Sequence, residues 1–238
     1  MSRTINHMDI VHCAQMEQWE KMHTIVADIN QMHIRQAFYM LCKQGNANAV
    51  EQIAHHFQND DGFVCECIAG GMEHSITLDT LKILRPLLQS IPITDPDVLQ
   101  AALRNQNPQA DEMLEYIVPW YDPDFLRQHC MVILTMVLKK VGDKKTRGFF
   151  AIMERIGLSN SNIDISTRAV NCTLEHLVIS DQQRLMQMIG EENLKVVAQR
   201  LQHKKFTTDI IEAYCAVEQR KRMVGAIDLS HCSRTRKI

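Results

Sequence analysis

The chain has 238 residues, of which 45% are hydrophobic and 23% charged, and its formal net charge is −2. These values exclude a collagen-like or intrinsically disordered chain, and the near-neutral charge favours neither nucleic acid nor a membrane surface as partner. Glycine (9) and proline (6) are scarce, methionine (14) is abundant, and no sustained strand alternation occurs, which together indicate a helical protein with a sizeable core.

No targeting or membrane-spanning segment is evident. Apolar runs such as residues 131–138 are far shorter than the roughly 18 residues that a spanning helix needs. The N-terminal segment MSRTINHMDIVHCAQ lacks the apolar stretch and cleavage site of a secretory signal. Eight irregularly spaced cysteines favour reduced thiols. We therefore expect a cytoplasmic protein, and delivery into a host cell by a route without a cleavable signal stays open.

Residues 8–30 predict a first helix that caps the N-terminal end. Its apolar residues recur at helical spacing along one face, and they are Ile10, Ala14, Met22, Ile25, Val26 and Ile29. The next stretch, AFYMLCKQGNANAVEQI (residues 37–53), predicts a helix, a tight turn at Gly45-Asn46 and a second helix, because Gly and Asn tolerate the left-handed conformation that ends helices.

The same helix–turn–helix pattern recurs along the chain. Its later copies cover residues 64–88, 98–118, 130–156, 169–189 and 194–217, with turns predicted at residues 70–75 and 141–143 among others. Turn centres lie roughly 29 to 39 residues apart, which is typical of helix-pair repeats. Asp95-Pro96 and Asp122-Pro123 each place an N-cap acid before a proline at the first helical position.

These patterns predict an all-α fold, a solenoid-like stack of about six antiparallel helix pairs. The expected divisions are an N-terminal capping helix over residues 1–33, a helical-repeat domain over residues 34–218 and a basic, flexible C-terminal tail over residues 219–238.

The stretches AFYMLCKQGNANAVEQI (37–53) and LQAALRNQNPQADEMLEYIVPWYDP (99–123) are similar to the middle of an ankyrin repeat, and the resemblance covers roughly residues 34–215. The Thr-Pro-Leu-His start of that repeat is missing from every copy, and residues 143–165 carry an insertion-like loop. The resemblance implies a curved stack whose concave face grips another protein. It also implies a link with eukaryotic adaptors, bacterial effectors and viral proteins that act inside host cells.

Cys65, Cys67 and His74 form the densest set of soft metal ligands. Zinc would need four such groups, and two cysteines two positions apart on a helix point about 200° apart, so buried cysteines that act as small hydrophobic residues are the simpler interpretation. Motifs for zinc proteases, serine nucleophiles and phosphate loops are missing. We expect no catalytic residue, cofactor or metal, and a metal- or thiol-dependent enzyme remains one alternative.

Basic residues gather late in the chain, at Lys139-Lys140, Lys144-Lys145, Lys204-Lys205 and residues 220–222. A helical repeat that binds nucleic acid is therefore a second alternative, although the overall charge argues against it.

Trp120-Tyr121 lies in a loop between Pro119 and Pro123, and large aromatic residues on loops are enriched at binding hot spots. The competing interpretation is that the tryptophan closes the core under the loop. We expect partner contacts at Trp120 and Tyr121, with Tyr116 and Phe63 as weaker candidates. The predicted function is a non-catalytic protein–protein interaction scaffold or adaptor, with no small-molecule substrate indicated.

Overall fold

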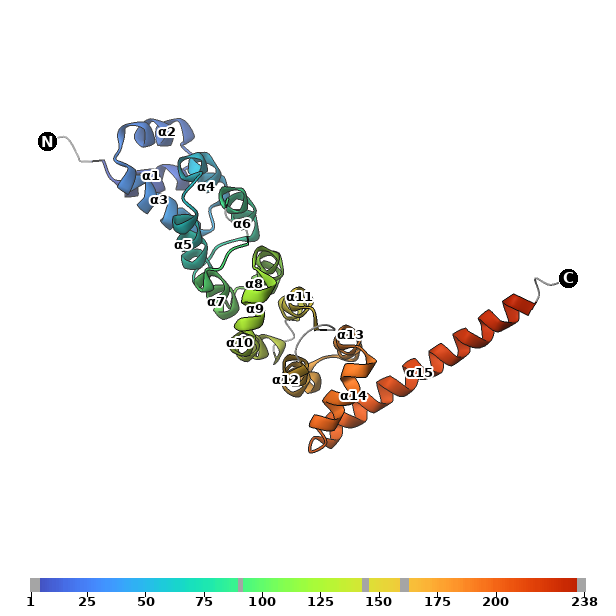
Figure 1. The fold of residues 1–238 in the computed structure, drawn as a ribbon. Coiled ribbons are helices and arrows are strands. Elements are labelled where there is room, and N and C mark those ends of the chain that lie inside the picture. Colours follow the sequence, from blue (N-terminus) through green and yellow to red (C-terminus); the bar gives the residue numbers. More distant parts are fainter. Residues whose placement is uncertain (1–4, 90–91, 143–145, 159–162, 235–238) are drawn as a thin grey trace. The chain divides into compact units, whose positions relative to one another are not determined.

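Helices account for all the regular secondary structure of the described residues in the computed structural model (Figure 1). The structure describes residues 5–89, 92–142, 146–158 and 163–234. The only β-type backbone pairing within these ranges is an isolated bridge between Ile93 and Tyr121. The all-α prediction is therefore confirmed. None of the helices in these ranges has both the length and the apolar character that crossing a bilayer requires.

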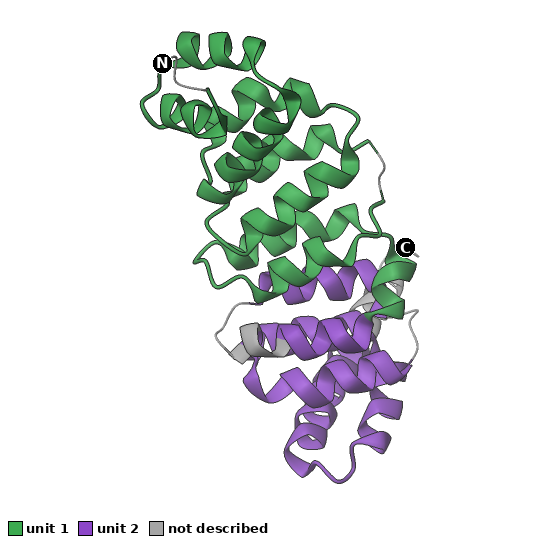
Figure 2. Ribbon diagram, turned by 90° about the vertical axis from the view of Figure 1, so that its left-hand side faces the viewer, with its two compact units in different colours: residues 1–129 green, residues 130–238 purple. Residues whose placement is uncertain are grey.

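The chain forms two compact units, residues 1–129 and residues 130–238 (Figure 2). This division does not coincide with the limits predicted from the sequence at residues 33/34 and 218/219. The two units are described separately below, as unit 1 and unit 2.

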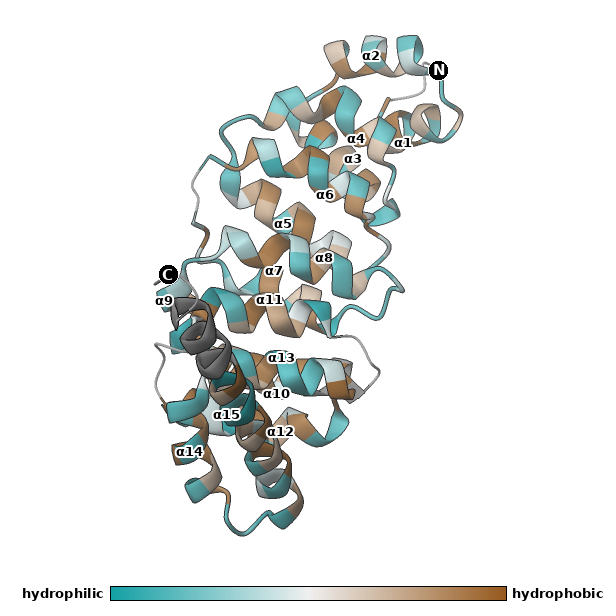
Figure 3. Ribbon diagram, turned by 90° about the vertical axis from the view of Figure 1, so that its right-hand side faces the viewer, coloured by the Kyte–Doolittle hydropathy of each residue, from teal (hydrophilic) through white to brown (hydrophobic). Residues whose placement is uncertain are grey.

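Unit 1 holds two rows of helices. In one row α1 packs against α3, α3 against α5 and α5 against α7, and in the other α4 packs against α6 and α6 against α8. Polar and apolar residues alternate along these helices (Figure 3), so that each helix has an apolar side to bury. The elements are α1 (His7–Gln15), α2 (Trp19–Asp28), α3 (Gln31–Gln44), α4 (Ala47–Ile53), η1 (Ala54–Phe57), α5 (Asp61–Met72), α6 (Leu78–Leu84), η2 (Arg85–Leu87), α7 (Pro96–Arg104), α8 (Ala110–Ile117), η3 (Val118–Trp120) and α9 (Pro123–Gln128).

The predicted turn between α3 and α4 is confirmed. Gly45 has a φ of 67°, in the left-handed region that glycine adopts without strain. Its N–H donates to the carbonyl of Cys42, and the N–H of Asn46 donates to the carbonyl of Leu41, both at 3.1 Å. The Asn46 side chain accepts from the N–H of Ala49 and so starts α4.

The turn predicted at residues 70–75 begins too early. Gly70 and Gly71 lie inside α5 and are buried, so they do not end that helix. A Cβ atom at Gly70 would lie 2.4 Å from the Tyr39 hydroxyl oxygen. Glycine is therefore needed here because α3 and α5 pack closely, and not because the chain turns.

The two predicted aspartate caps are confirmed. The Asp95 side chain accepts from the N–H of Asp97 at 2.8 Å and starts α7. The Asp122 side chain accepts from the N–H groups of Asp124 and Phe125, at 2.6 and 3.2 Å, and starts α9. In both helices the proline after the aspartate occupies the first turn, where its missing N–H costs nothing.

The prediction of one helix over residues 8–30 is wrong, because that segment forms α1 and α2. The chain turns at Glu17, whose φ of 54° is left-handed. Ile10 from α1 and Met22 from α2 are both fully buried, and the two helices pack against each other. The N-terminal cap of unit 1 is thus a helix pair, and folding back lets two short helices bury both of their apolar stripes.

Unit 2 is also helical. In it α10 packs against α11 and α12, α12 and α13 pack against α14, and both α13 and α14 pack against α15. The predicted turn at residues 141–143 is shifted, because α10 includes residues 141 and 142; residue 143 lies outside the described ranges. The elements are α10 (Cys130–Gly142), α11 (Arg147–Ile156), α12 (Ile163–Thr173), η5 (Leu174–His176), α13 (Ile179–Ile189), α14 (Glu191–Arg200) and α15 (Lys205–Arg234).

The predicted flexible tail over residues 219–238 is instead helical as far as Arg234, because α15 continues without a break past residue 218. Residues 235–238 lie outside the described ranges. The side chains of residues 220–224 are all exposed.

Candidate functional site

A groove of about 570 Å³ lies on unit 1 between α6 and α8, and we call it the α6–α8 groove. It is lined by Leu78, Arg85, Glu112, Glu115, Tyr116, Pro119 and Trp120. Helix α8 tightens into η3 at Pro119, and this brings Tyr116 and Trp120, four positions apart, onto the same side of the chain.

Two aromatic rings form one wall of this groove. The centroids of Tyr116 and Trp120 are 5.4 Å apart, and their planes meet at 79°. The Arg85 guanidinium lies 5.8 Å from the centroid of the Trp120 ring, within the range of a cation–π contact. Edge-to-face pairing of this kind fixes the two ring planes relative to each other.

The charged side chains around the groove are unevenly paired. Glu112 and Glu115 are exposed, and neither has a hydrogen bond or ion pair to another described residue. Lys82 lies nearby and pairs with Asp79 at 2.9 Å. The hydrogen bond to Asp79 is the main cause of the raised pKa of Lys82, and the charges of Asp79 and Glu112 add to it. Arg85 likewise has no ion pair to a described residue, so the groove carries two unpaired carboxylates and one unpaired guanidinium.

Two polar groups of the aromatic wall also lack partners. Trp120 is 4% exposed, yet its indole N–H donates to no acceptor in the described part of the chain. The Tyr116 hydroxyl likewise has no partner there. The indole nitrogen itself is solvent-accessible, so water can satisfy this donor and an acceptor on a bound molecule can replace that water.

Tyr121 and Phe63, which the sequence suggests as partner contacts, lie inside unit 1. Tyr121 is 0% exposed and its hydroxyl donates to the carbonyl of Asp95 at 2.8 Å. Phe63 is buried 5.0 Å from the ring of Phe57, and Arg35 covers it at 4.0 Å. Neither ring lines the α6–α8 groove, so neither is placed to touch a partner there while unit 1 stays folded. Trp120 is buried to a similar degree, at 4% exposed, but a small part of its surface lines the groove. Tyr121 and Phe63 thus close the core, and so does most of the Trp120 side chain, which is what the competing interpretation expected of the tryptophan.

Cys65 and Cys67 are both buried in α5. Burial is the main cause of the raised pKa of each thiol, about 11 for Cys65, and contact with Cys42 adds to the rise at Cys67. His74 Nδ1 lies 2.9 Å from the carbonyl of Gly70. Among the described residues no group of three or more His, Cys, Asp or Glu side chains is placed to hold a metal ion. Raised thiol pKa values disfavour the thiolate that a nucleophile or zinc ligand must provide.

Arg85, Glu112 and Glu115 line the groove but were not singled out from the sequence. Glu112 precedes Tyr116 by four positions, and Glu115 precedes Pro119 by four. At this helical spacing the two acids, the tyrosine and the proline lie along one side of α8 and η3. That spacing could have indicated from the sequence that the two glutamates share a surface with Tyr116. The part played by Arg85 was not predictable from local sequence, because it meets Trp120 from a different element.

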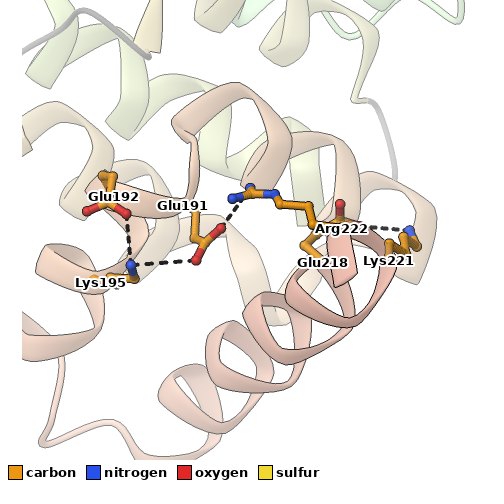
Figure 4. Close-up of polar contacts among 6 residues, drawn as sticks. All are labelled: Glu191, Glu192, Lys195, Glu218, Lys221 and Arg222. Atoms are coloured by element: carbon orange, nitrogen blue, oxygen red, sulfur yellow. Dashed lines mark hydrogen bonds and ion pairs between the residues drawn. The ribbon is translucent and has the colours of Figure 1, made fainter. Parts of the chain in front are cut away.

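Unit 2 contains a charged cluster where α14 meets α15 (Figure 4). Lys195 lies 2.8 Å from Glu192 and 3.5 Å from Glu191, and Arg222 lies 2.7 Å from Glu191. The hydrogen bond between Lys195 and Glu192 is the main cause of the raised pKa of the lysine and the lowered pKa of the glutamate. Lys221 pairs with Glu218 at 2.7 Å. Pairing with carboxylates reduces the positive potential that phosphate binding needs.

A second groove, of about 280 Å³, lies between α13 and α15 in unit 2. Its lining includes Ile179, which is 73% exposed, together with Tyr214 and Val217. It has one half-buried tyrosine and no paired aromatic rings. It is therefore the natural comparison surface for experiments on the α6–α8 groove.

Comparison of the chain with protein-family models, with curated proteins and with solved structures finds no match.

Proposed function

We propose that the chain is a non-catalytic protein-interaction scaffold and that its α6–α8 groove is the contact site for a protein partner. The observation that carries the proposal is the groove itself, in which the half-buried ring of Tyr116, held against Trp120, lies beside two exposed carboxylates. Tyrosine, tryptophan and arginine are the residues most enriched at binding hot spots, and all three line this groove.

The helix arrangement of unit 1 supports the second part of the proposal, a solenoid-like stack of antiparallel helix pairs. Its two rows, α1–α3–α5–α7 and α4–α6–α8, are what successive helix pairs produce when each pair contacts only its neighbours. The similarity of residues 37–53 and 99–123 to ankyrin repeats agrees with this proposal. It also suggests an adaptor, or an effector that acts on a host protein.

The state of the thiols supports a non-catalytic role over a thiol-dependent enzyme. Folding holds Cys65 and Cys67 as buried, protonated thiols, whereas a nucleophilic cysteine needs a lowered pKa and access to substrate.

The test is a photocrosslink from inside the groove. A benzophenone amino acid replaces Tyr116 in the full-length chain, and matched chains carry it at Glu51, on the exposed side of α4, or at Tyr214, in the α13–α15 groove. We expect one defined crosslinked protein from position 116 and none from position 51. Equal labelling from positions 51 and 116 would contradict a specific site there. Labelling from position 214 alone would move the site to unit 2.

Once that partner is purified, its affinity gives the quantitative test. Tyr116→Ala is expected to weaken binding by about 30-fold or more, the loss typical of a hot-spot side chain. Far-UV circular dichroism of the variant checks that unit 1 is still folded.

A further inference from the structure

Given the proposed function, on which this inference rests, we propose that the α6–α8 groove binds an extended, proline-containing segment that carries an arginine or lysine. Three features of the groove lead to this partner chemistry, and each concerns a different part of the ligand.

The first feature is the aromatic wall, which suits proline. The half-buried ring of Tyr116 meets the nearly buried ring of Trp120 at 79°, and Tyr116 and the exposed ring of Pro119 supply most of the apolar surface that a ligand can reach. A pyrrolidine ring is compact and apolar, and it loses little conformational entropy on binding because its backbone is already restricted. Aromatic-lined grooves are the usual receptors for polyproline II segments for this reason.

The second feature is the indole N–H of Trp120, which selects the partner's backbone. It has no acceptor among the described residues although the side chain is 4% exposed. A polyproline II segment has no internal hydrogen bonds, so its carbonyl groups are free to accept. Most carbonyl groups of an α-helix are already bonded within the helix. An extended segment therefore satisfies this donor, whereas a docked helix leaves it unpaired.

The third feature is the pair of glutamates, which selects the partner's charge. Glu112 and Glu115 are three positions apart on α8, exposed and without an ion pair in the described part of the chain. The Arg85 guanidinium opposite them is directed over the Trp120 ring. The two unpaired carboxylates outnumber the one guanidinium, so a partner arginine or lysine is favoured over a partner carboxylate.

The experiment follows Trp120 by its own fluorescence. The chain has two tryptophans, so Trp19→Phe in the full-length protein leaves Trp120 as the single emitter. The probe is the peptide acetyl-Pro-Pro-Leu-Pro-Pro-Arg-amide. One comparison peptide has glutamate in place of arginine, and another has alanine in place of every proline.

We expect the probe to change the Trp120 emission in a saturable manner. Replacing its arginine by glutamate should weaken binding roughly tenfold or more, and replacing its prolines by alanine should abolish saturation. In the protein, Glu112→Gln with Glu115→Gln should reduce the preference for arginine over glutamate. The control Glu51→Gln should leave it unchanged. Both glutamates are exposed, so folding of the double variant is not in question.

Absence of a saturable change, or equal binding of the all-alanine peptide, would overturn the inference. So would a preference for the glutamate peptide. The crosslinking experiment at position 116 separates this failure from failure of the proposed function. A partner that still crosslinks there while the proline peptide does not bind would leave the scaffold in place and remove only the proline-based recognition.

Discussion

Replacing Gly45 by alanine tests the turn on which the helix-pair interpretation depends. Two costs add at this position. With φ at 67°, an alanine would be held in the left-handed region at a cost of about 1–2 kcal/mol. Its Cβ would also lie 2.3 Å from the carbonyl oxygen of Ser75, a backbone atom that can yield only if the next turn moves. Overpacking of this kind costs about 1–3 kcal/mol, so the total expected loss is about 2–5 kcal/mol.

Tryptophan emission during urea unfolding measures this loss. Both tryptophans, Trp19 and Trp120, lie in unit 1, so their emission reports the unfolding of that unit. With an m-value of about 2 kcal/mol/M, the Gly45→Ala midpoint should fall by roughly 1–2.5 M. Gly45→Asn should lower the stability of unit 1 less than Gly45→Ala. Asparagine tolerates the left-handed conformation, so only the close approach of its Cβ to Ser75 remains.

Gly62→Ala is the matched control for this substitution. Gly62 is exposed in the first turn of α5, and a Cβ there would have no heavy atom within 4 Å. The same chemical change should therefore stabilise unit 1 by about 0.5 kcal/mol through the entropy of the unfolded chain. The two variants should shift in opposite directions. A Gly45→Ala midpoint within the error of the parent chain, or shifted upward like that of Gly62→Ala, would refute the reasoning.

Three further predictions concern buried and paired groups. Tyr121→Phe removes the hydroxyl that donates to Asp95 and should lower the stability of unit 1 by about 1–2 kcal/mol in urea. Folding raises the pKa of Cys65 from 9.0 to about 11. Folded unit 1 therefore holds that proton more tightly than the unfolded chain, so this contribution to stability is complete below pH 9 and is lost as pH rises from 9 to 11. The urea midpoint should fall over this range, and less so in Cys65→Ala. Arg222→Gln removes one of the two cationic partners of Glu191, Lys195 being the other, and should destabilise unit 2 by no more than about 1 kcal/mol, because Arg222 is largely exposed.

Each of these has a result that would contradict it. Tyr121→Phe with unchanged stability but weaker partner binding would place Tyr121 at the interface and not in the core. A midpoint that rises between pH 9 and 11 would reverse the sign expected for a buried thiol. The stability of Arg222→Gln is measured by thermal circular dichroism. A loss of stability that is as large in high salt as in low salt would show that the contact is not mainly electrostatic.

Local signals explain what could be predicted from the sequence. The turn at Gly45-Asn46 and the caps at Asp95 and Asp122 depend on backbone preferences of single residues and their immediate neighbours. The break at Glu17 has no such signal, because a glutamate with a positive φ is held there by the packing of α1 on α2. A glycine such as Gly70 can indicate either a turn or close helix packing. Only its position against Tyr39 in the structure decides for close packing.

The sequence pointed to some of the residues that line the candidate site. Tyr116 and Trp120 stand out as large aromatic residues near a proline-marked loop, and the structure places both at the α6–α8 groove. The sequence does not show that Trp120 and Tyr121 are both buried, at 4% and 0% exposed, whereas Tyr116 is only half-buried. The contribution of Arg85 depends on the packing of α6 against α8, a tertiary contact that no local pattern encodes.

The most direct test of the scaffold proposal is calorimetric titration of the protein captured by the position-116 crosslink against three forms of the full-length chain. These are the parent, Tyr116→Ala in the α6–α8 groove and Tyr214→Ala in the α13–α15 groove. The proposal requires a loss of affinity of about 30-fold or more for Tyr116→Ala and an unchanged affinity for Tyr214→Ala. Equal affinities of the parent and a folded Tyr116→Ala would contradict it.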